Sequence, residues 1–423
     1  MEITNLIDFK AKALQWAAAF EVCCCFDSNT YPDQYSRYDF LLAAGKRREL
    51  AINAGTAFDA LKSFRKERNS WLFGLLGYDL KNETEQLNSA HTDHLGFPDL
   101  YFFEPEYLIA IKNGQVEILE GPESLVMLIE ATLLPVTPAL RPAMEIKSRM
   151  DRNTYLGKVE ELRDHILRGD IYEVNFCQEF YAEAALLDPL ALYYRLNSLS
   201  PTPFSAYFKS GAKYILSASP ERYLCKRGSK VFSQPIKGTA KRSGDHKSDE
   251  ALKTALRNDL KEQAENVMIV DLVRNDLTRC AVPGSVQVEE LFGIYSFPQV
   301  HQMISTVSCQ LDPSADPVDA IRHTFPMGSM TGAPKIRAMQ LIEEIELSKR
   351  GAYSGAIGYL DPNDDFDFNV LIRSIFYAAD EQYLSFQVGG AITYASSAAA
   401  EYEECILKAS AIVDTLQPEQ LKD

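Results

Sequence analysis

Two stretches of the sequence each carry a pair of glutamates three residues apart. One pair is Glu262 and Glu265, in KEQAENVMIVDL, and the other is Glu401 and Glu404, in AAAEYEECILKAS. This spacing puts both carboxylates of a pair on one face of a helix, a turn apart. Hard oxygen ligands on rigid helices suit Mg²⁺. The same pattern is also typical of a solvated helix surface, where Lys408 would be a plain i,i+4 partner of Glu404.

A lysine in the segment SQPIKGTAKR has the surroundings of a reactive amine. Lys237 follows a predicted strand and stands between Pro235 and Gly238, which predicts a rigid turn open to close approach. If burial strips part of its solvation, its pKa falls and the free amine becomes a nucleophile. An exposed turn lysine is the alternative. A pyridoxal phosphate lysine is disfavoured, since no phosphate-binding loop accompanies it.

Three further features suit an anionic substrate. Glu221 follows Pro220 in SASPER at a strand end, where burial would make it a general acid, although a turn-stabilising role is also open. Arg373 lies in an apolar strand and requires an anionic partner there. Gly389 and Gly390, in VGGAITY, offer backbone N–H groups. GSMTGAPK lacks the spacing of a phosphate loop, so we exclude nucleotide binding.

Composition excludes several classes of protein. The chain has 423 residues, 46% of them hydrophobic and 24% charged, with a net charge of −16, which argues against nucleic acid or an anionic membrane as partner. No apolar run approaches the roughly 18 residues of a membrane span, and the first residues lack a basic secretory signal. The eight cysteines form no C-x-x-C pair and no glutaminase nucleophile turn. We therefore expect buried, reduced thiols and a cytoplasmic protein.

The elements that would position these side chains alternate between hairpins and helices. Up to residue ~140 the sequence predicts strands and short helices, including a hairpin that turns at Asn113-Gly114. Prolines 135, 138 and 142 mark a crossing segment. Beyond it we expect helices over 153–169 and 248–272, a strand over NVLIRSIFYA, and a last helix that begins near Ser396. The pattern predicts an α+β fold with regions 1–140 and 141–423 interlocked.

Taken in order, the motifs resemble those of the chorismate-utilising enzymes. This family includes anthranilate synthase component I, aminodeoxychorismate synthase component I, isochorismate synthase and salicylate synthase. The resemblance is dense from about residue 153 to 413, and it runs through SASPER, PIKGT, AENVMIVDLVRNDL, FPMGSMTGAPKIRAM, RGAYSGAIGYL, VGGAITY and EYEECILKA. It implies large antiparallel sheets packed as a sandwich with flanking helices.

The resemblance also implies roles for individual residues. The glutamates would surround Mg²⁺, with Glu265 and Glu404 as direct ligands and Glu262 and Glu401 beside them. Catalysis is implied for Lys237, Glu221 and His301, the last near the leaving hydroxyl. Substrate binding is implied for Thr239, Thr331, Tyr353, Arg373, Gly389, Gly390 and Lys408.

Lys237 indicates the branch of the family. The motif PIKGT resembles the corresponding motif of aminodeoxychorismate synthase component I. In anthranilate synthases the corresponding motif resembles PIAGT. The resemblance implies amination of chorismate at C4 to 4-amino-4-deoxychorismate, for p-aminobenzoate and folate synthesis. Ammonia would come from a separate glutamine amidotransferase subunit, since we expect no fused glutaminase or lyase domain. The alternatives are anthranilate synthase component I, a non-catalytic relative, and a bifunctional enzyme that also releases p-aminobenzoate.

Two positions depart from the family pattern. Glu173 replaces the usual glutamine, at the position where the water-using members carry a lysine base, so activation of water is disfavoured. Ala391 stands where many members have a second functional glycine. A tryptophan site in the amino-terminal region has no matching motif.

Overall fold

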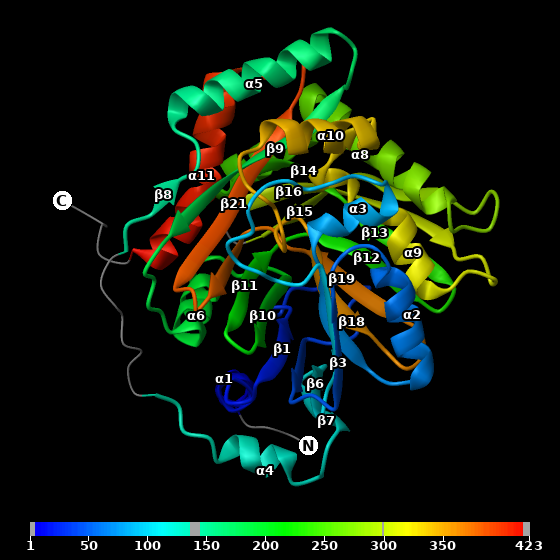
Figure 1. Cartoon of the computed structure of the whole chain (residues 1–423), viewed down its shortest axis with the longest axis vertical. Helices are drawn as coiled ribbons and strands as arrows, with labels where there is room; N and C mark the ends of the chain where they lie inside the picture. Colours follow the sequence, from blue (N-terminus) through cyan, green and yellow to red (C-terminus); the bar gives the residue numbers. More distant parts are fainter. Residues whose placement is uncertain (1–4, 136–143, 298–299, 418–423) are drawn as a thin grey trace.

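Two large antiparallel sheets carry most of the strands of this computed structural model, which describes residues 5–135, 144–297 and 300–417. The strands of sheet A, in spatial order, are β17 (Gly332–Ala333), β9 (Glu173–Ala182), β21 (Tyr383–Ile392), β20 (Ser374–Ala378), β11 (Lys213–Ser219), β10 (Phe204–Ser210), β1 (Val22–Asp27), β2 (Phe40–Ala44), β6 (Tyr107–Lys112) and β7 (Gln115–Glu120), with β8 (Lys147–Ser148) beside β9. Figure 1 shows β9 and β21 running side by side through the upper part of the molecule.

Sheet B packs against sheet A. Its strands, in spatial order, are β14 (Ile236–Lys241), β16 (Val300–Gln310), β13 (Lys230–Gln234), β12 (Arg222–Arg227), β19 (Phe366–Val370), β18 (Ala356–Leu360), β4 (Leu72–Leu76), β5 (Leu100–Glu104) and β3 (Arg48–Ile52), with β15 (Gln287–Ser296) beside β16. The α+β sandwich predicted from the sequence is confirmed.

Both parts of the chain contribute to both sheets. Strands β1, β2, β6 and β7 complete one end of sheet A, and β3, β4 and β5 complete one end of sheet B. The predicted hairpin between β6 and β7 turns at Asn113 and Gly114, both with positive φ. The proposed boundary at residue 140, with Pro138 and Pro142, lies outside the described residues and stays a prediction.

Strand alternation divides the core into two clusters. On β1, Cys23 and Cys25 face a cluster that packs sheet A against helices, while Cys24 faces the cluster between the sheets. Successive side chains of a strand point to opposite faces, which explains how three consecutive cysteines are all buried. All eight cysteines are free and buried, as predicted.

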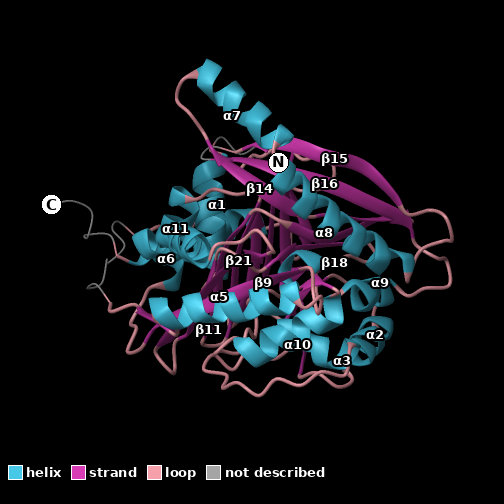
Figure 2. Cartoon of the chain, turned by 90° about the horizontal axis from the view of Figure 1, so that it is seen from above, coloured by secondary structure: helices cyan, strands magenta, loops and turns pink. Residues whose placement is uncertain are grey.

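Helices cover both outer faces of the sandwich. The outer face of sheet A is covered by α1 (Leu6–Ala17), α4 (Leu125–Glu130), α5 (Arg152–Leu167), α6 (Pro189–Leu199), α10 (Lys335–Ile345) and α11 (Ala398–Leu416). The other core cluster extends under α2 (Ala57–Glu67), α8 (Leu260–Thr278) and α9 (Pro317–Thr324), while α7 (His246–Asn258) projects outward (Figure 2). Short turns of helix form η1 (Tyr78–Leu80), α3 (Lys81–Thr84) and η2 (Gly328–Met330). Within the described ranges, no helix has the length and apolarity to cross a membrane.

The single helix predicted over 248–272 is wrong. The chain forms α7 and then α8, because Asp259 adopts an extended conformation (φ −71°, ψ 114°) and its side chain accepts hydrogen bonds from the backbone N–H groups of Lys261 and Glu262. Aspartate competes with helix continuation through such local bonds. The break starts a new helix directly before the first glutamate pair.

The single strand predicted over NVLIRSIFYA is also wrong. Strand β19 ends at Val370 in sheet B, and β20 begins at Ser374 in sheet A. Between them Arg373 has φ +52°, in the left-handed region that non-glycine residues seldom occupy. Such backbone strain is found where the surrounding structure fixes a functional residue. This crossing therefore places Arg373 where the chain passes from one sheet to the other.

Replacement of Asp259 by alanine tests the helix break. We expect Asp259→Ala to lower the free energy of unfolding by about 1 kcal/mol, because α8 loses its N-cap. Asp271→Ala, on the exposed surface of the same helix, is the control and should change it by less than about 0.5 kcal/mol. Urea unfolding followed by circular dichroism measures both. Equal losses in the two variants would contradict the capping role.

Candidate active site

A buried ion pair joins the edges of the two sheets. Lys237 Nζ, on β14 of sheet B, donates a hydrogen bond of 2.7 Å to Glu173 Oε1, on β9 of sheet A. The lysine side chain is 11% exposed and the glutamate 1%. Burial lowers the pKa of Lys237, but the charges of Glu173, Glu265 and Glu221 outweigh burial and raise the pKa above its usual value. The prediction of a lowered lysine pKa is wrong, because it considered burial without the partners.

The backbone around Lys237 explains how the side chain reaches the interior. The register of β14 against β16 shifts between Ile236 and Thr239, which is the irregularity of a β-bulge. Gly238 has φ +92°, and a Cβ there would lie 3.1 Å from Glu262 Oε2. Glycine is therefore required on two grounds, its backbone conformation and the close approach of α8.

Glu221 lies at the link between β11 and β12, near Lys237. It is 5% exposed, and burial raises its pKa from an ordinary value of 4.5 to about 7, although the charge of Lys237 acts in the opposite direction. Near neutral pH this carboxyl is therefore protonated in a large fraction of molecules. That is the state a general acid needs, so the condition set for this role is met, and the role itself stays a prediction.

The four predicted metal-site glutamates come from two helices. Glu262 and Glu265 lie on α8, and Glu401 and Glu404 lie on α11. Burial raises the pKa of Glu265 to about 7, and burial also raises the pKa values of Glu262 and Glu401.

A lysine that the sequence analysis missed lies among these carboxylates. Lys261 Nζ is 3.8 Å from Glu265 Oε1. Burial lowers the pKa of Lys261, but the charges of all four glutamates of the two pairs outweigh burial and raise the pKa. The ammonium group of Lys261 thus interacts with both glutamate pairs, which means that the two pairs share one electrostatic environment. The i,i+4 spacing from Glu265 was the available sequence signal.

The glutamates do not form a finished coordination shell. Within the described residues, no group of three or more His, Cys, Asp or Glu side chains is placed to hold a metal ion. The donor set nevertheless has the chemistry of a Mg²⁺ site, since it consists of carboxylate oxygens. Glu262, Glu265 and Glu401 share partly desolvated surroundings in which a cation would offset the cost of ionising them.

Strand β21 brings two glycines next to α11. A Cβ at Gly390 would lie 3.4 Å from Glu401 Oε2 and 4.0 Å from Glu404 Oε1, which are ordinary contact distances. A Cβ at Gly389 would lie 2.3 Å from the Phe176 carbonyl oxygen, so only Gly389 leaves no room for a side chain. Lys408 Nζ is 2.7 Å from Glu404 Oε1 and donates a hydrogen bond to the Gly389 carbonyl at 3.1 Å. Lys408 is therefore both the i,i+4 partner of Glu404 and a tie between α11 and the strand.

Arg373 lacks the anionic partner that its surroundings require. No hydrogen bond or ion pair from the described residues reaches its guanidinium, and burial lowers its pKa despite the charge of Glu404 and the nearby Tyr353. The Tyr353 hydroxyl is 3.4 Å from Cys177 Sγ. A partly buried guanidinium without a carboxylate partner is costly, so this position favours an anionic ligand.

Three predicted residues lie outside this charged cluster. His301 is fully buried, with Nδ1 2.8 Å from Ser296 Oγ and Nε2 3.0 Å from Asp249 Oδ1. Thr331 is fully buried and donates to the Gly328 carbonyl, while Thr239 is exposed. A catalytic histidine would have to give up one of its two bonds, so the roles of all three stay predictions.

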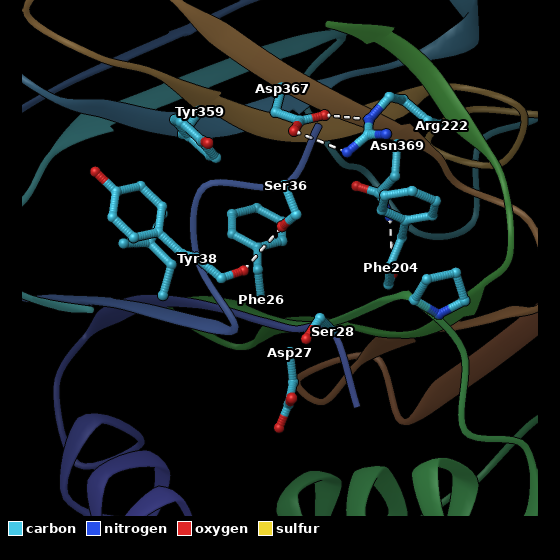
Figure 3. Close-up of a pocket in the computed structure, with 12 residues that line it drawn as sticks. Phe26, Asp27, Ser28, Ser36, Tyr38, Phe204, Arg222, Tyr359, Asp367 and Asn369 are labelled. Atoms are coloured by element: carbon cyan, nitrogen blue, oxygen red, sulfur yellow. Dashed lines mark hydrogen bonds and ion pairs between the residues drawn. The ribbon is translucent and has the colours of Figure 1, made fainter. Parts of the chain in front are cut away.

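None of the predicted site residues lines either of two cavities in the described part of the chain. The first is lined from both sheets by Phe26, Tyr38 and Tyr359, with the Arg222–Asp367 ion pair at one side (Figure 3). The second, of about 330 Å³, is lined by residues 31–35, by Tyr295 of β15 and by Pro220 and Ile236. Pro220 and Ile236 precede Glu221 and Lys237 in the chain, so the second cavity lies next to the backbone that carries these two side chains.

Comparison with known proteins identifies the family. The sequence profile of the chorismate binding enzymes matches residues 21–414, so the chain belongs to this family, as its motifs predicted. A Klebsiella aerogenes protein named aminodeoxychorismate synthase component 1 is 35% identical over 348 residues, 81% of this chain and 76% of that protein. Anthranilate synthase component 1 of Thermus thermophilus is 36% identical over 358 residues, 81% of this chain and 77% of that protein. The crystal structure of anthranilate synthase component I from Streptococcus pneumoniae has a TM-score of 0.79 at 29% identity and covers 90% of this chain and 93% of its own.

The raised pKa of Glu221 has a measurable effect on stability. Between pH 4.5 and about 7 the folded chain holds a proton on Glu221 that the unfolded chain releases, so this contribution to stability is lost as pH rises. Glutamine mimics the protonated acid at every pH. We therefore expect Glu221→Gln to gain stability relative to wild type from pH 5 to pH 8, by on the order of 3 kcal/mol at most.

Urea unfolding of both proteins at several pH values measures this difference. Glu403→Gln, at an exposed position of α11, is the control and should give a difference that does not change with pH. A constant difference between Glu221→Gln and wild type would mean that Glu221 titrates at the same pH in the folded and unfolded chain.

Proposed function

We propose that the chain aminates chorismate at C4 to give 4-amino-4-deoxychorismate, for the synthesis of p-aminobenzoate and folate in the cytoplasm. The observation that carries the proposal is Lys237, an amine held at the meeting point of the sheets among Glu173, Glu221 and Glu265. The family supplies chorismate as the substrate class, and the relative from Klebsiella aerogenes supports the amination branch.

The charges of the cluster suit a dianionic substrate. Arg373 is a cation without a carboxylate partner, and a substrate carboxylate would provide one. Tyr353, which lies near Arg373, would form one wall of the place where this substrate carboxylate binds. Glu262, Glu265, Glu401 and Glu404 would hold Mg²⁺, which would supply positive charge for the ring carboxylate.

The reaction itself requires a nucleophile, an acid and ammonia. Lys237 would add at ring C2 while the C4 hydroxyl leaves with a proton from Glu221, whose pKa of about 7 suits that role. Ammonia would then add at C4 and expel the lysine. A side chain held against the ring gives the high effective concentration that such a displacement needs.

Anthranilate synthase component I is the second candidate. The relative from Thermus thermophilus is 36% identical, against 35% for the relative from Klebsiella aerogenes, so overall similarity does not separate the two activities. The side chain at position 237 favours C4 amination, because a lysine that occupies C2 transiently keeps ammonia from that carbon. We further propose that ammonia is supplied in the cell by a separate glutamine amidotransferase subunit.

The product assay tests the function directly. We expect the purified chain with chorismate, Mg²⁺ and ammonium to form 4-amino-4-deoxychorismate, identified by mass and NMR, and to be inactive with glutamine alone. Lys237→Ala should bind chorismate but form this product at least about 100-fold more slowly, because the positioned nucleophile is gone.

Any residual product of Lys237→Ala should carry nitrogen at C2. Lys241→Ala, at the exposed end of the same strand, is the matched control and should keep the wild-type rate and product. Anthranilate as the main product of the wild-type chain would favour the second candidate. Full C4 amination by Lys237→Ala would exclude the covalent role.

Removal of single carboxylates tests the metal site. We expect Glu265→Gln and Glu404→Gln each to lower the amination rate by about 100-fold and to weaken Mg²⁺ binding in calorimetry, with the fold intact. Glu403→Gln serves as the control, because it changes an exposed carboxylate on α11 that is not part of the cluster. Unchanged Mg²⁺ affinity in both variants would contradict the proposed ligands.

A further inference from the structure

We propose that Glu173 is the base that takes the proton of Lys237 when the lysine attacks the substrate. This role rests on the proposed function and adds a catalytic residue to it. At this position the family usually has a glutamine, whose amide would hold the lysine but has no basic oxygen to receive its proton.

The geometry makes Glu173 the acceptor. Its Oε1 already receives a hydrogen bond of 2.7 Å from Lys237 Nζ, so transfer of a proton requires no movement of either side chain. Its Oε2 is buried and has no hydrogen-bond partner among the described residues. Lys237 is thus the one hydrogen-bond donor to the Glu173 carboxylate among the described residues.

The other acids around Lys237 are less suited to this step. The carboxylates that act on the ammonium are Glu173 from β9, Glu262 and Glu265 from α8, Glu404 from α11, and Glu221 from the link between β11 and β12. Only Glu173 makes a direct hydrogen bond to Nζ among the described residues. Glu221 is needed in its protonated form for the leaving hydroxyl, and Glu265 is a proposed metal ligand.

The step balances without any further reactant. Glu173 accepts a proton from the Lys237 ammonium, and the freed electron pair forms the N–C2 bond. The two ring double bonds shift toward C4, the C4–O bond breaks, and the hydroxyl leaves as water with the proton of Glu221. Ammonia then forms the C4–N bond, the double bonds shift back, and the C2–N bond breaks. Glu173 returns its proton to the departing amine, and Glu221 takes one from the new ammonium group.

The experiment compares the wild-type chain with Glu173→Gln. The amide keeps the shape of the side chain and a hydrogen-bond acceptor but loses the base, so we expect amination at pH 7 to fall by about 100-fold. In the variant only lysine already deprotonated by solvent reacts, and that fraction grows tenfold per pH unit below the lysine pKa. The ratio of wild-type to variant kcat should therefore shrink about tenfold for each pH unit, until it levels off. Effects of ammonia and of Glu221 on the rate cancel in this ratio.

A second carboxylate on the same strand provides the control. Glu179 is also buried on β9 and pairs with Arg149 at 2.9 Å, outside the cluster. We expect Glu179→Gln to give a ratio to wild type that does not change with pH. Glu173→Asp keeps the base at a longer reach and should also give a ratio independent of pH. The aspartate variant supplies the comparison if Glu173→Gln does not fold.

The outcomes separate this inference from the proposed function. A ratio for Glu173→Gln that stays constant with pH, or a wild-type rate in that variant, would overturn the role of Glu173 while C4 amination by the wild-type chain stands. If the glutamine variant does not fold, a pH-dependent ratio for Glu173→Asp would overturn it. A wild-type chain that forms no C4-aminated product would overturn the proposed function and this inference with it.

Discussion

The ion pair between Glu173 and Lys237 is the interaction on which the arrangement of the site depends. Each partner belongs to a different sheet, and each is almost completely withdrawn from water. Removal of one partner from such a pair leaves an uncompensated buried charge, which typically costs about 3–5 kcal/mol. The pair therefore constrains how the edges of the sandwich meet, and it raises the pKa of an amine whose pKa burial alone would lower.

Electrostatic compensation also connects the pair with the rest of the cluster. Most of the carboxylates have raised pKa values because burial penalises their ionised forms, and the nearby lysines offset only part of that penalty. The Arg373 guanidinium has no ion-pair partner among the described residues, although the charge of Glu404 acts on it. A ligand with two carboxylates and a divalent cation would satisfy both imbalances together. Neither the ligand nor the cation would do so alone, which predicts coupled binding of the two.

The residue patterns predicted which helices and strands form more accurately than they predicted where each element begins and ends. The β6–β7 hairpin, α5 and α11 follow from local signals, namely a turn dipeptide, helical periodicity and the serines that precede the last helix. The break at Asp259 was missed because strong helix formers stand on both sides of it. The sequence analysis expected a lowered pKa for Lys237, and it missed the increase for a different reason. Its partner Glu173 is 64 residues away in the sequence, so no local pattern contains the interaction.

The helix termini explain how so much negative charge is tolerated in one place. Asp259 ends α7 and begins α8, which puts Glu262 in the first turn of the new helix, and Glu401 lies in the first turn of α11. The positive end of a helix dipole favours carboxylates there by about 0.3–1 kcal/mol each. Had 248–272 been one continuous helix, Glu262 and Glu265 would lie in its interior without that stabilisation. The backbone break is therefore part of the electrostatics of the site, and Lys261, one residue before Glu262, adds positive charge that acts on both glutamate pairs.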